Sequence, residues 1–365
     1  MRIAQLANFY TPTSGGLRTA VDTLGHGYLA SGHERILIVP GKHRTEADTE
    51  AGLVITLPGV PVSGGYRMVA RPSHVRRELD RLAPDSVEVS DKATMLTAGD
   101  WARANNARSI LFSHERLDTW LAARLPWGRA LRPAIERWNR RIAARFDTIV
   151  VTSAFAADEF HQLGVHATRK IALGVDLVTF HPKPRTPGET TKLAYAGRLS
   201  PEKNPAAVVK AVELLARDKN ITLDVYGTGS ALPALRRQAA GLPVTFHGHL
   251  TSRAELATRL AEADIAFAPS PAETFGLSVL EALACGTPVI TANTGGAPEL
   301  LSEGAGIAVS PTPQGLADGV RRLLDRPGTR RAARLRAESF PWAATIRAML
   351  RVHEATESEV RGHVH

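Results

Sequence analysis

The chain has 365 residues, of which 44% are hydrophobic, and this length and composition are typical of about two soluble domains. Its one cysteine, Cys285, excludes an intrachain disulfide and gives no indication of a zinc cluster. The formal net charge of +9 favours anionic partners. Aromatic residues make up only 5% and are not interleaved with the basic ones, which argues against a protein that binds single-stranded nucleic acid.

The first residues, Met1-Arg-Ile-Ala-Gln-Leu-Ala7, lack the regions of a signal peptide. No apolar run reaches the roughly 18 residues of a membrane span. The sequence therefore predicts a cytoplasmic location.

Short apolar runs alternate with helical stretches through the first half of the chain. The alternation predicts an open, mostly parallel sheet covered on both faces, in which ligands bind outside the carboxyl ends of the strands. The expected strands are Arg2–Ala7, Arg35–Val39, Leu53–Leu57, Val87–Val89, Ser109–Phe112 and Thr148–Thr152.

Paired glycines, Gly15 and Gly16, follow the first strand, ahead of a helix expected from about Thr19. Glycines let the backbone approach a ligand closely, and the helix would add a positive N-terminus. A plain flexible turn explains the pair equally well.

His114 directly follows another expected strand, beside Glu115 and Asp118. Catalytic groups gather at strand ends in parallel sheets. A lone histidine there is still more often structural or exposed than catalytic.

The stretch Leu121–Phe146 combines seven arginines and a single acid, Glu136, with an apolar stripe at roughly helical spacing. A basic amphipathic helix of this kind can lie on an anionic membrane surface. The commoner explanation is a solvated face over an ordinary core stripe. The arginines are Arg124, Arg129, Arg132, Arg137, Arg140, Arg141 and Arg145, and the stripe is Trp127, Leu131, Ile135, Trp138 and Ile142.

A segment rich in proline and glycine, Leu173–Glu189, has the composition of an interdomain linker. A second alternation of strands and helices follows it, so the sequence predicts two α/β domains. The expected strands are Lys192–Ala196, Thr222–Tyr226, Val244–His247, Ile265–Ala268, Val289–Thr291 and Gly306–Val309.

Two cations, Arg198 and Lys203, lie in the loop after the first of these strands. A planar guanidinium and a flexible ammonium together suit a diphosphate. Exposed surface cations are the alternative, but the adjoining Gly197, Ser200 and Pro201 would fix the loop and favour a ligand site.

Glycines also follow two later strands. Gly227-x-Gly229 is an incomplete dinucleotide fingerprint, because its third glycine is missing, and it indicates a tight turn beside a ligand crevice. Gly295 and Gly296 fit either a plain turn or close approach to a bound nucleotide or sugar.

Two carboxylates, Glu273 and Glu281, lie eight residues apart between the strands Ile265–Ala268 and Val289–Thr291. We expect Glu273 in a loop and Glu281 about two turns along a helix that ends at Gly286. The N–H groups at the helix start could hold an anion while the carboxylates accept hydrogen bonds from hydroxyl groups.

In their order and spacing, these motifs resemble those of retaining glycosyltransferases of the GT-B fold, in the large Glu-x7-Glu family that includes bacterial mannosyltransferases. The resemblance rests on Glu273, Glu281 and the intervening Phe275-Gly-Leu277, and on the segments 15–16, 197–203, 284–290 and 295–299. It implies two doubly wound Rossmann-like domains that face a central crevice. These would be an acceptor domain at 1–175, a donor domain at 190–340 and a C-terminal helix, 341–365, that crosses back to the first domain.

The resemblance also implies roles for single residues. Arg198 and Lys203 would neutralise the donor diphosphate as it leaves. Glu281 would accept hydrogen bonds from ribose hydroxyls and Glu273 from the transferred sugar, while His114 would contact that sugar near the reacting centre. The other expected donor contacts are Gly15, Gly16, Gly197, Gly227, His249, Leu250, Thr274, Phe275, Gly276 and Leu277.

The sequence therefore predicts a retaining hexosyltransferase, of mannose or glucose type, that uses a GDP- or UDP-hexose and an acceptor hydroxyl on a lipid or glycan. No Asp-x-Asp metal motif occupies a strand-end loop, so we expect neither a metal nor another cofactor. We expect no nucleic-acid partner, and peripheral attachment to the inner face of a membrane through Leu121–Phe146. Two alternatives stay open: a nucleotide-sugar epimerase of the same fold, and a basic protein that binds nucleic acid or membrane.

Overall fold

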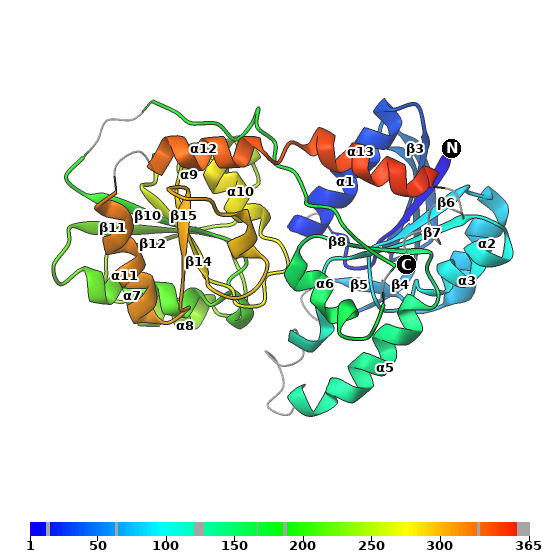
Figure 1. Ribbon diagram of the computed structural model, residues 1–365, viewed down its shortest axis with the longest axis horizontal. Helices are drawn as coiled ribbons and strands as arrows, with labels where there is room; N and C mark the ends of the chain where they lie inside the picture. Colours follow the sequence, from blue (N-terminus) through cyan, green and yellow to red (C-terminus); the bar gives the residue numbers. More distant parts are fainter. Residues whose placement is uncertain are drawn as a thin grey trace. The chain divides into compact units, whose positions relative to one another are not determined.

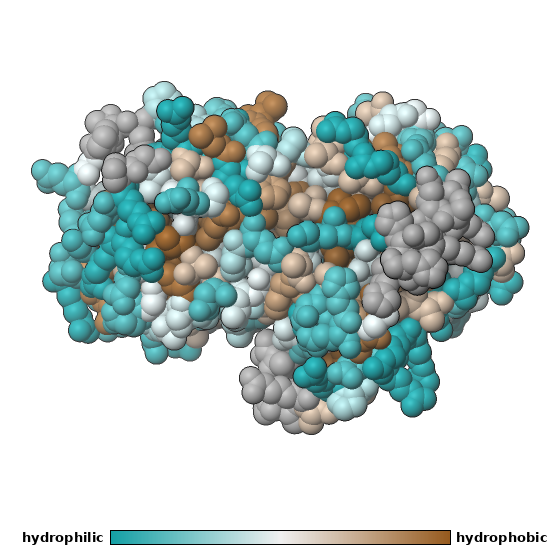
Figure 2. Space-filling view, in the orientation of Figure 1, coloured by the Kyte–Doolittle hydropathy of each residue, from teal (hydrophilic) through white to brown (hydrophobic). Residues whose placement is uncertain are grey.

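The computed structural model describes residues 1–11, 15–62, 65–119, 128–165, 167–184, 188–326 and 329–355. The chain forms two compact units, each with its own sheet (Figure 1). Unit 1 comprises residues 1–118, 129–172 and 343–365, and unit 2 comprises residues 119–128 and 173–342. On the visible face, most of the surface of each unit is hydrophilic (Figure 2).

Unit 1 is built on a sheet with nine strands in the described part of the chain, in the order β3-β4-β2-β1-β6-β7-β8-β9, with β5 paired to β4. Among the pairings of these described strands, those of β3 and β5 with β4 are antiparallel and the others are parallel. The strand order reverses between β1 and β6, which is where ligands bind in sheets of this kind. The strands are β1 (Arg2–Leu6), β2 (Glu34–Gly41), β3 (Thr45–Thr49), β4 (Gly52–Pro61), β5 (Arg67–Val69), β6 (Ser86–Val89), β7 (Arg108–Ser113), β8 (Thr148–Val151) and β9 (Thr168–Lys170).

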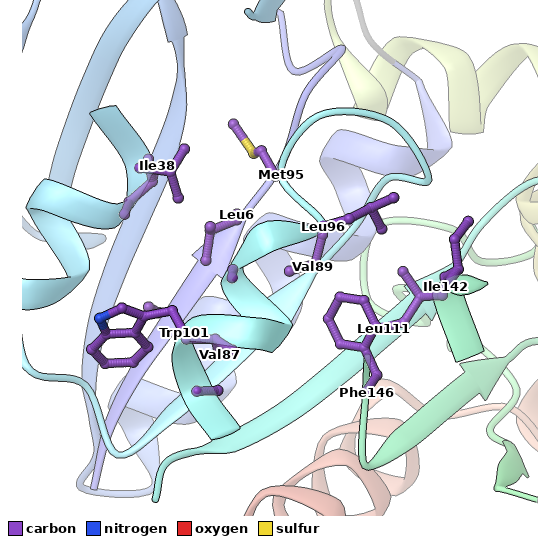
Figure 3. Close-up of a cluster of buried hydrophobic side chains, with 14 of the residues drawn as sticks. Leu6, Ile38, Val87, Val89, Met95, Leu96, Trp101, Leu111, Ile142 and Phe146 are labelled. Carbon is purple, nitrogen blue, oxygen red and sulfur yellow. The ribbon is translucent and has the colours of Figure 1, made fainter. Parts of the chain in front are cut away.

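Helices pack on both faces of this sheet because successive strand residues point to opposite sides. Leu37 packs with Val21 of α1, whereas its neighbour Ile38 belongs to a larger cluster on the other face. Figure 3 shows part of that cluster, in which Leu111 and Ile142 are grouped around Phe146. The helices are α1 (Gly16–Ala30), α2 (Pro72–Leu82), α3 (Thr97–Ala104), α5 (Arg132–Ala143), α6 (Ala154–His161) and α13 (Trp342–Glu354), with a short 3-10 helix, η2 (Gly128–Leu131).

Unit 2 contains a six-stranded, all-parallel sheet among its described residues, in the order β12-β11-β10-β13-β14-β15. Counted from β10, this is the order 3-2-1-4-5-6 found in dinucleotide-binding sheets. Its switch point lies between β10 and β13. The strands are β10 (Thr191–Ala196), β11 (Ile221–Tyr226), β12 (Val244–Gly248), β13 (Ile265–Ala268), β14 (Val289–Ala292) and β15 (Gly306–Val309).

One hydrophobic cluster of unit 2 lies between one face of its sheet and three helices, α7, α8 and α11. Leu193, Leu223 and Phe267 of the strands pack there against Val208 and Leu316 of the helices. The helices of this unit are α7 (Pro205–Leu215), α8 (Leu232–Gln238), α9 (Arg253–Glu262), α10 (Leu277–Ala284), α11 (Pro313–Leu324) and α12 (Thr329–Glu338), with the 3-10 helices η3 (Pro201–Lys203) and η4 (Ala297–Leu300).

The predicted fold class is confirmed by these two sheets, and every strand expected from the sequence is present. Three further strands were missed. β3 is exposed along its whole length and therefore lacks an apolar pattern, whereas β5 and β9 have three residues each. The first helix begins at Gly16 rather than near Thr19.

The stretch 121–146 differs from the single helix expected there. Helix α5 covers Arg132–Ala143 only, after the 3-10 turn η2. Residues 120–127, including Arg124 and Trp127, lie outside the described residues.

The chain returns from unit 2 to unit 1 at its C-terminal end. Val175 pairs with Phe340 and Pro341 at the boundary, where the Val175 N–H donates to the carbonyl of Phe340 at 2.9 Å. Beyond it, α13 packs on unit 1, where the hydroxyl of Thr345 donates to the carbonyl of Ala172 at 2.9 Å. Met349 on the same helix is fully buried.

Candidate functional site

The loop after β10, residues 197–203, carries Arg198 and Lys203 at the switch point of the unit 2 sheet. Tyr195 is buried near the end of β10 and holds this loop in place. Its hydroxyl donates to the carbonyl of Arg198 at 3.1 Å and lies 3.5 Å from the carbonyl of Lys203. Burial, helped by the nearby charges of Glu273 and Glu202, raises the pKa of Tyr195 well above its ordinary value. The tyrosine therefore stays protonated and keeps its role as a donor.

The glycines after β11 have a structural reason to be there. Gly227 has φ +139°, and a Cβ on it would lie 1.9 Å from the carbonyl oxygen of Gly197. A Cβ on Gly229 would lie 2.2 Å from the carbonyl oxygen of Leu199. The two loops are joined by hydrogen bonds from the N–H groups of Gly197 and Leu199, both 2.9 Å long. Gly227 and Gly229 thus support the loop that carries Arg198.

Glu273 lies in the loop after β13, the other strand at the switch point, and its carboxylate pairs with Lys203 at 2.6 Å. The hydroxyl of Ser270 ties the same loop to the carbonyl of Glu202 at 2.9 Å. The structure thus brings together the predicted diphosphate loop and the predicted sugar-binding carboxylate.

Gly295 and Gly296 support Glu273 from the backbone side. The N–H of Gly296 donates to the carbonyl of Glu273 at 2.6 Å. Gly295 has φ +87°, and a Cβ on it would lie 2.9 Å from the same carbonyl oxygen. The sequence left two explanations open for these glycines, a plain turn or close approach to a ligand. The structure shows that they form a turn that supports Glu273.

Helix α10 starts at Leu277, four positions after Glu273. Gly276, with φ +107°, precedes its first residue, Leu277, and Phe275 is buried beneath the turn. The N-terminus of a helix attracts anions because its first N–H groups have no partner within the helix. The helix ends before Gly286, which has φ +73°, as the sequence predicts.

Glu281 lies on the second turn of α10 and is 9% exposed. One of its oxygens pairs with Arg253 at 3.0 Å, and Arg253 also covers the ring of Phe180 at 4.9 Å. Burial raises the pKa of Glu281, while Arg253 opposes that rise. A carboxylate that has one oxygen held by arginine keeps its other oxygen for a hydroxyl ligand.

His249 and Leu250 precede Arg253 in the loop after β12. His249 is exposed and Leu250 is half-buried. The pair between Arg253 and Glu281 brings this loop to α10. His247 belongs to β12 itself, with its ring 2.6 Å from the carboxylate of Asp224 and stacked on Tyr226.

Unit 1 holds the other predicted site residues. Gly15 and Gly16 are exposed at the start of α1, after β1, and a Cβ on Gly15 would have open space around it. His114 follows β7, with its ring stacked on Phe112 at 4.3 Å and its Nε2 3.4 Å from the hydroxyl of Ser90. The structure therefore places both features at carboxyl ends of the unit 1 strands.

Family models match both units. The model described as glycosyl transferase 4-like domain matches residues 15–174, and the model described as glycosyl transferases group 1 matches residues 179–340. A mycobacterial relative is 43% identical over 96% of this chain and 95% of its own length.

The chain belongs to the group 1 family of glycosyltransferases.

The protein is therefore a retaining glycosyltransferase, and the predicted reaction class is confirmed. The mycobacterial relative is the GDP-mannose-dependent alpha-(1-6)-phosphatidylinositol dimannoside mannosyltransferase of Mycobacterium tuberculosis (strain ATCC 25177 / H37Ra). The D-inositol 3-phosphate glycosyltransferase of Saccharomonospora viridis is 31% identical, over 61% of this chain and 59% of its own.

Solved structures match the glycosyltransferase over nearly its whole length. Sucrose-phosphate synthase from Thermosynechococcus elongatus superposes with a TM-score of 0.83 at 21% identity, covering 97% of this chain and 98% of its own. WaaG, a glycosyltransferase involved in lipopolysaccharide biosynthesis, superposes with a TM-score of 0.73 at 17% identity, covering 97% of this chain and 100% of its own. At these identities the likeness confirms the GT-B fold.

Two residues that support the site of this glycosyltransferase were missed from the sequence. Arg253 opens α9, where a cation is unfavourable next to the positive end of the helix. This unfavourable position indicated that the charge of Arg253 has a partner outside α9, which is Glu281. Tyr195 carried no such signal, because a tyrosine in a buried strand is ordinary.

Proposed function

We propose that this glycosyltransferase transfers a mannosyl group from GDP-mannose to a hydroxyl of a phosphatidylinositol mannoside. The 43% identity to the mycobacterial mannosyltransferase, along nearly the full length of both chains, carries the proposal. The donor chemistry of unit 2 supports it, since cations and hydroxyl acceptors lie on neighbouring loops there.

In this proposal, Arg198 and Lys203 bind the diphosphate and offset the charge that develops on it as the bond to the sugar breaks. Lys203 already pairs with Glu273 and has three N–H donors, so it can keep this contact while it donates to phosphate. Glu273 then accepts a hydrogen bond from the sugar. The start of α10 adds its N–H groups to the phosphate contacts.

Glu281 is proposed to accept hydrogen bonds from the ribose, and His114 to contact the sugar near the reacting carbon. The acceptor hydroxyl would attack from the same face that the diphosphate leaves, and a diphosphate oxygen would take its proton. This path retains the anomeric configuration without a protein nucleophile. We also propose that the charge on the diphosphate is met by Arg198, Lys203 and helix N-termini rather than by a metal.

A donor and acceptor screen read by mass spectrometry tests this function. Purified enzyme is incubated with GDP-mannose, GDP-glucose, UDP-glucose or UDP-galactose, with and without phosphatidylinositol mannosides. We expect one added hexose only with GDP-mannose and the lipid. Transfer from a UDP-sugar alone would contradict the proposed donor, and an epimerised nucleotide sugar formed without acceptor would identify an epimerase.

A separate experiment tests the different roles proposed for Glu273 and Glu281. Glu273→Gln should lower transfer far more than GDP binding, because Glu273 is assigned to the sugar. Glu281→Gln should weaken GDP binding itself. Equal loss of GDP affinity in both variants would contradict the assignment.

Helix α5 is the proposed contact with an anionic membrane surface. Arg137, Arg140 and Arg141 are exposed and form no ion pair with any described residue. In the apolar stripe, however, Ile135 and Ile142 are buried inside unit 1, and Trp138, although 37% exposed, donates a hydrogen bond to the carbonyl of Lys92 at 3.1 Å. Attachment would therefore be electrostatic, with α5 lying on the lipid headgroups. The visible surface of α5 is mostly hydrophilic (Figure 2).

No helix in the part of the chain that the structure describes is long and apolar enough to cross a bilayer.

Flotation with vesicles of phosphatidylcholine and phosphatidylinositol tests the attachment. Reversing the charge of Arg137, Arg140 and Arg141 should abolish flotation, and raised salt should do the same for the unaltered enzyme. The matched control reverses three exposed arginines of unit 2, Arg217, Arg236 and Arg237, and so changes net charge equally. Equal loss in both triple variants would assign the effect to net charge and count against α5.

A further inference from the structure

A fully buried carboxylate that has no role in the proposed reaction lies in the middle of the unit 1 sheet. Glu88, on β6, is 0% exposed. It accepts hydrogen bonds from the hydroxyl of Tyr28 at 2.7 Å and from the side-chain amide of Gln5 at 3.0 Å. The imidazole of His353 lies 3.2 Å from the same oxygen that accepts from Tyr28.

His353 comes from α13, 265 residues further along the chain. Its side chain is fully buried and both ring nitrogens are engaged, since Nδ1 lies 2.8 Å from the hydroxyl of Ser86. The ring also packs edge-on against Tyr28, with centroids 5.1 Å apart. The C-terminal helix therefore completes the set of partners around Glu88.

Burial alone would raise the pKa of Glu88, but the hydrogen bonds from His353, Tyr28 and Gln5 hold it below its ordinary value. The carboxylate is thus kept charged inside the protein. A buried charge of this kind adds little stability over a well-packed apolar core, whereas it strongly fixes the positions of its partners.

One arm of the network runs from Glu88 to the start of α1. The amide oxygen of Gln5 accepts from Nε of the buried Arg35 at 2.7 Å. Arg35 in turn donates to the carbonyl of Val21 at 3.1 Å and lies 3.4 Å from the carboxylate of Asp22.

Asp22 holds the residues on either side of the paired glycines. Its carboxylate accepts from the hydroxyl of Tyr10 at 2.7 Å and from Arg18 at 3.2 Å. Arg18 follows Gly16 by two positions on the first turn of α1. The position of the helix start is thereby linked to the interior of the sheet.

The other arm follows β6 toward His114. Ser86, Glu88 and Ser90 lie at alternate positions along the chain and so point to the same face of the sheet. The hydroxyl of Ser90 is the group that lies 3.4 Å from Nε2 of His114.

We propose that His353 and Glu88 are positioning residues for the transfer reaction, which set the start of α1 and the His114 ring from inside unit 1. The proposal rests on the roles proposed above for Gly16 and His114. It gives α13 a part in the reaction through its contacts inside unit 1.

Substitutions at one buried site, with a matched control on the same helix, test the proposal. His353→Leu removes both nitrogens, and His353→Gln keeps a donor toward Glu88. Thr345→Val is the control, since it removes a polar tether of α13 that lies outside the network, the hydrogen bond to the carbonyl of Ala172. Tyr28→Phe removes a single oxygen from the network and is the second variant if His353→Leu does not fold.

Turnover with GDP-mannose and lipid, GDP affinity and hydrogen exchange are measured on the full-length proteins. We expect His353→Leu and Tyr28→Phe to lower kcat about tenfold or more, with GDP affinity retained because unit 2 carries the cations. His353→Gln should recover most of kcat. Peptides that cover residues 8–22 and 110–118 should exchange faster in His353→Leu than in Thr345→Val.

Equal effects of His353→Leu and Thr345→Val on kcat and on exchange would overturn the proposal, because the helix would then act only as a structural cover. Unaltered enzyme that transfers no mannose would overturn the proposed function instead. Hydrogen exchange would still decide the positioning role in that case, since it needs no substrate.

Discussion

His114 is a neutral imidazole at physiological pH. Burial lowers its pKa from 6.5 to about 4; the charge of Glu88 opposes this shift and that of Lys92 adds to it. A neutral ring can donate one hydrogen bond to a sugar hydroxyl and accept another, but it cannot serve as a cationic acid at neutral pH.

The first prediction concerns pH. The unfolded chain binds a proton at His114 near pH 6.5 and the native protein only near pH 4, so this residue should make stability fall as the pH falls from 6.5 to 4. Urea unfolding at pH 7 and pH 5 should show a smaller pH effect in His114→Gln than in the unaltered enzyme. An identical pH effect in both would contradict the assigned ionisation.

The second prediction concerns Arg253, which opposes the rise that burial causes in the pKa of Glu281. Arg253→Ala should raise that pKa further and weaken GDP binding about tenfold, the scale of a hydrogen bond to a charged group. The loss should grow as the pH falls, because the carboxylate is the form that accepts from ribose. Calorimetry at pH 8 and pH 6 measures it.

A nucleotide without the ribose 2′-hydroxyl is the control for this prediction. Binding of 2′-deoxy-GDP should respond less than binding of GDP to Arg253→Ala. Equal responses would show that Glu281 and Arg253 act on the fold of the loop rather than on the ribose.

Among single residues, the sequence singled out those proposed to carry the reaction, but not those that support them. Glu273, Glu281 and Lys203 stood out through spacing and loop position. Glu88 and His353 could not be paired in advance, because their contact joins residues 265 positions apart and depends on where α13 packs.

The third prediction concerns the loop after β10, which is held in place by the loop after β11. Gly227→Ala places a methyl group 1.9 Å from the carbonyl of Gly197 and also strains a φ of +139°. We expect a loss of about 1–3 kcal/mol in the free energy of unfolding, with weaker GDP binding because Arg198 and Lys203 are displaced.

Gly241→Ala is the matched control for Gly227→Ala. Gly241 has φ +79° but open space around its Cβ position, so the change should cost about 1 kcal/mol of stability and leave GDP affinity intact. Equal GDP affinity in the two variants would contradict the supporting role of Gly227.

Among the elements, the strands of unit 2 were predictable because they are short, largely apolar runs bounded by turn residues. Strand β3 was not, since all five of its residues are exposed and its pairing depends on β4. The extent of α5 was overestimated because the arginine-rich pattern continues on both sides of the helix, to Arg129 in η2 and to Arg145 beyond its last residue, Ala143. A pattern of this kind marks a face but not where the helix begins or ends.

The two units of the molecule differ in how completely each is encoded by one stretch of chain. Nearly all of unit 2 lies within residues 173–342, whereas unit 1 needs α13 from the far end. Our fourth prediction is that a fragment of residues 173–342 folds and binds GDP. A fragment of residues 1–172 should stay poorly packed, because Glu88 lacks His353 and the surface under Met349 is uncovered.

Circular dichroism, thermal unfolding and GDP titration of the two fragments check this prediction. Addition of a peptide of residues 340–355 should sharpen the unfolding transition of the first fragment, and the same peptide with His353→Leu should not. A cooperative transition of residues 1–172 alone would contradict it.

The location of His353 also bears on how the protein is made. A ribosome adds about 5–20 residues per second, so on the order of 10–30 s pass between synthesis of Ala172 and that of α13. During that time the sheet of unit 1 holds a carboxylate without its histidine, while unit 2 can already close around its own core. The first part of the chain to be translated is therefore the last to be finished, and a chain that terminates early lacks the helix on which its unit 1 depends.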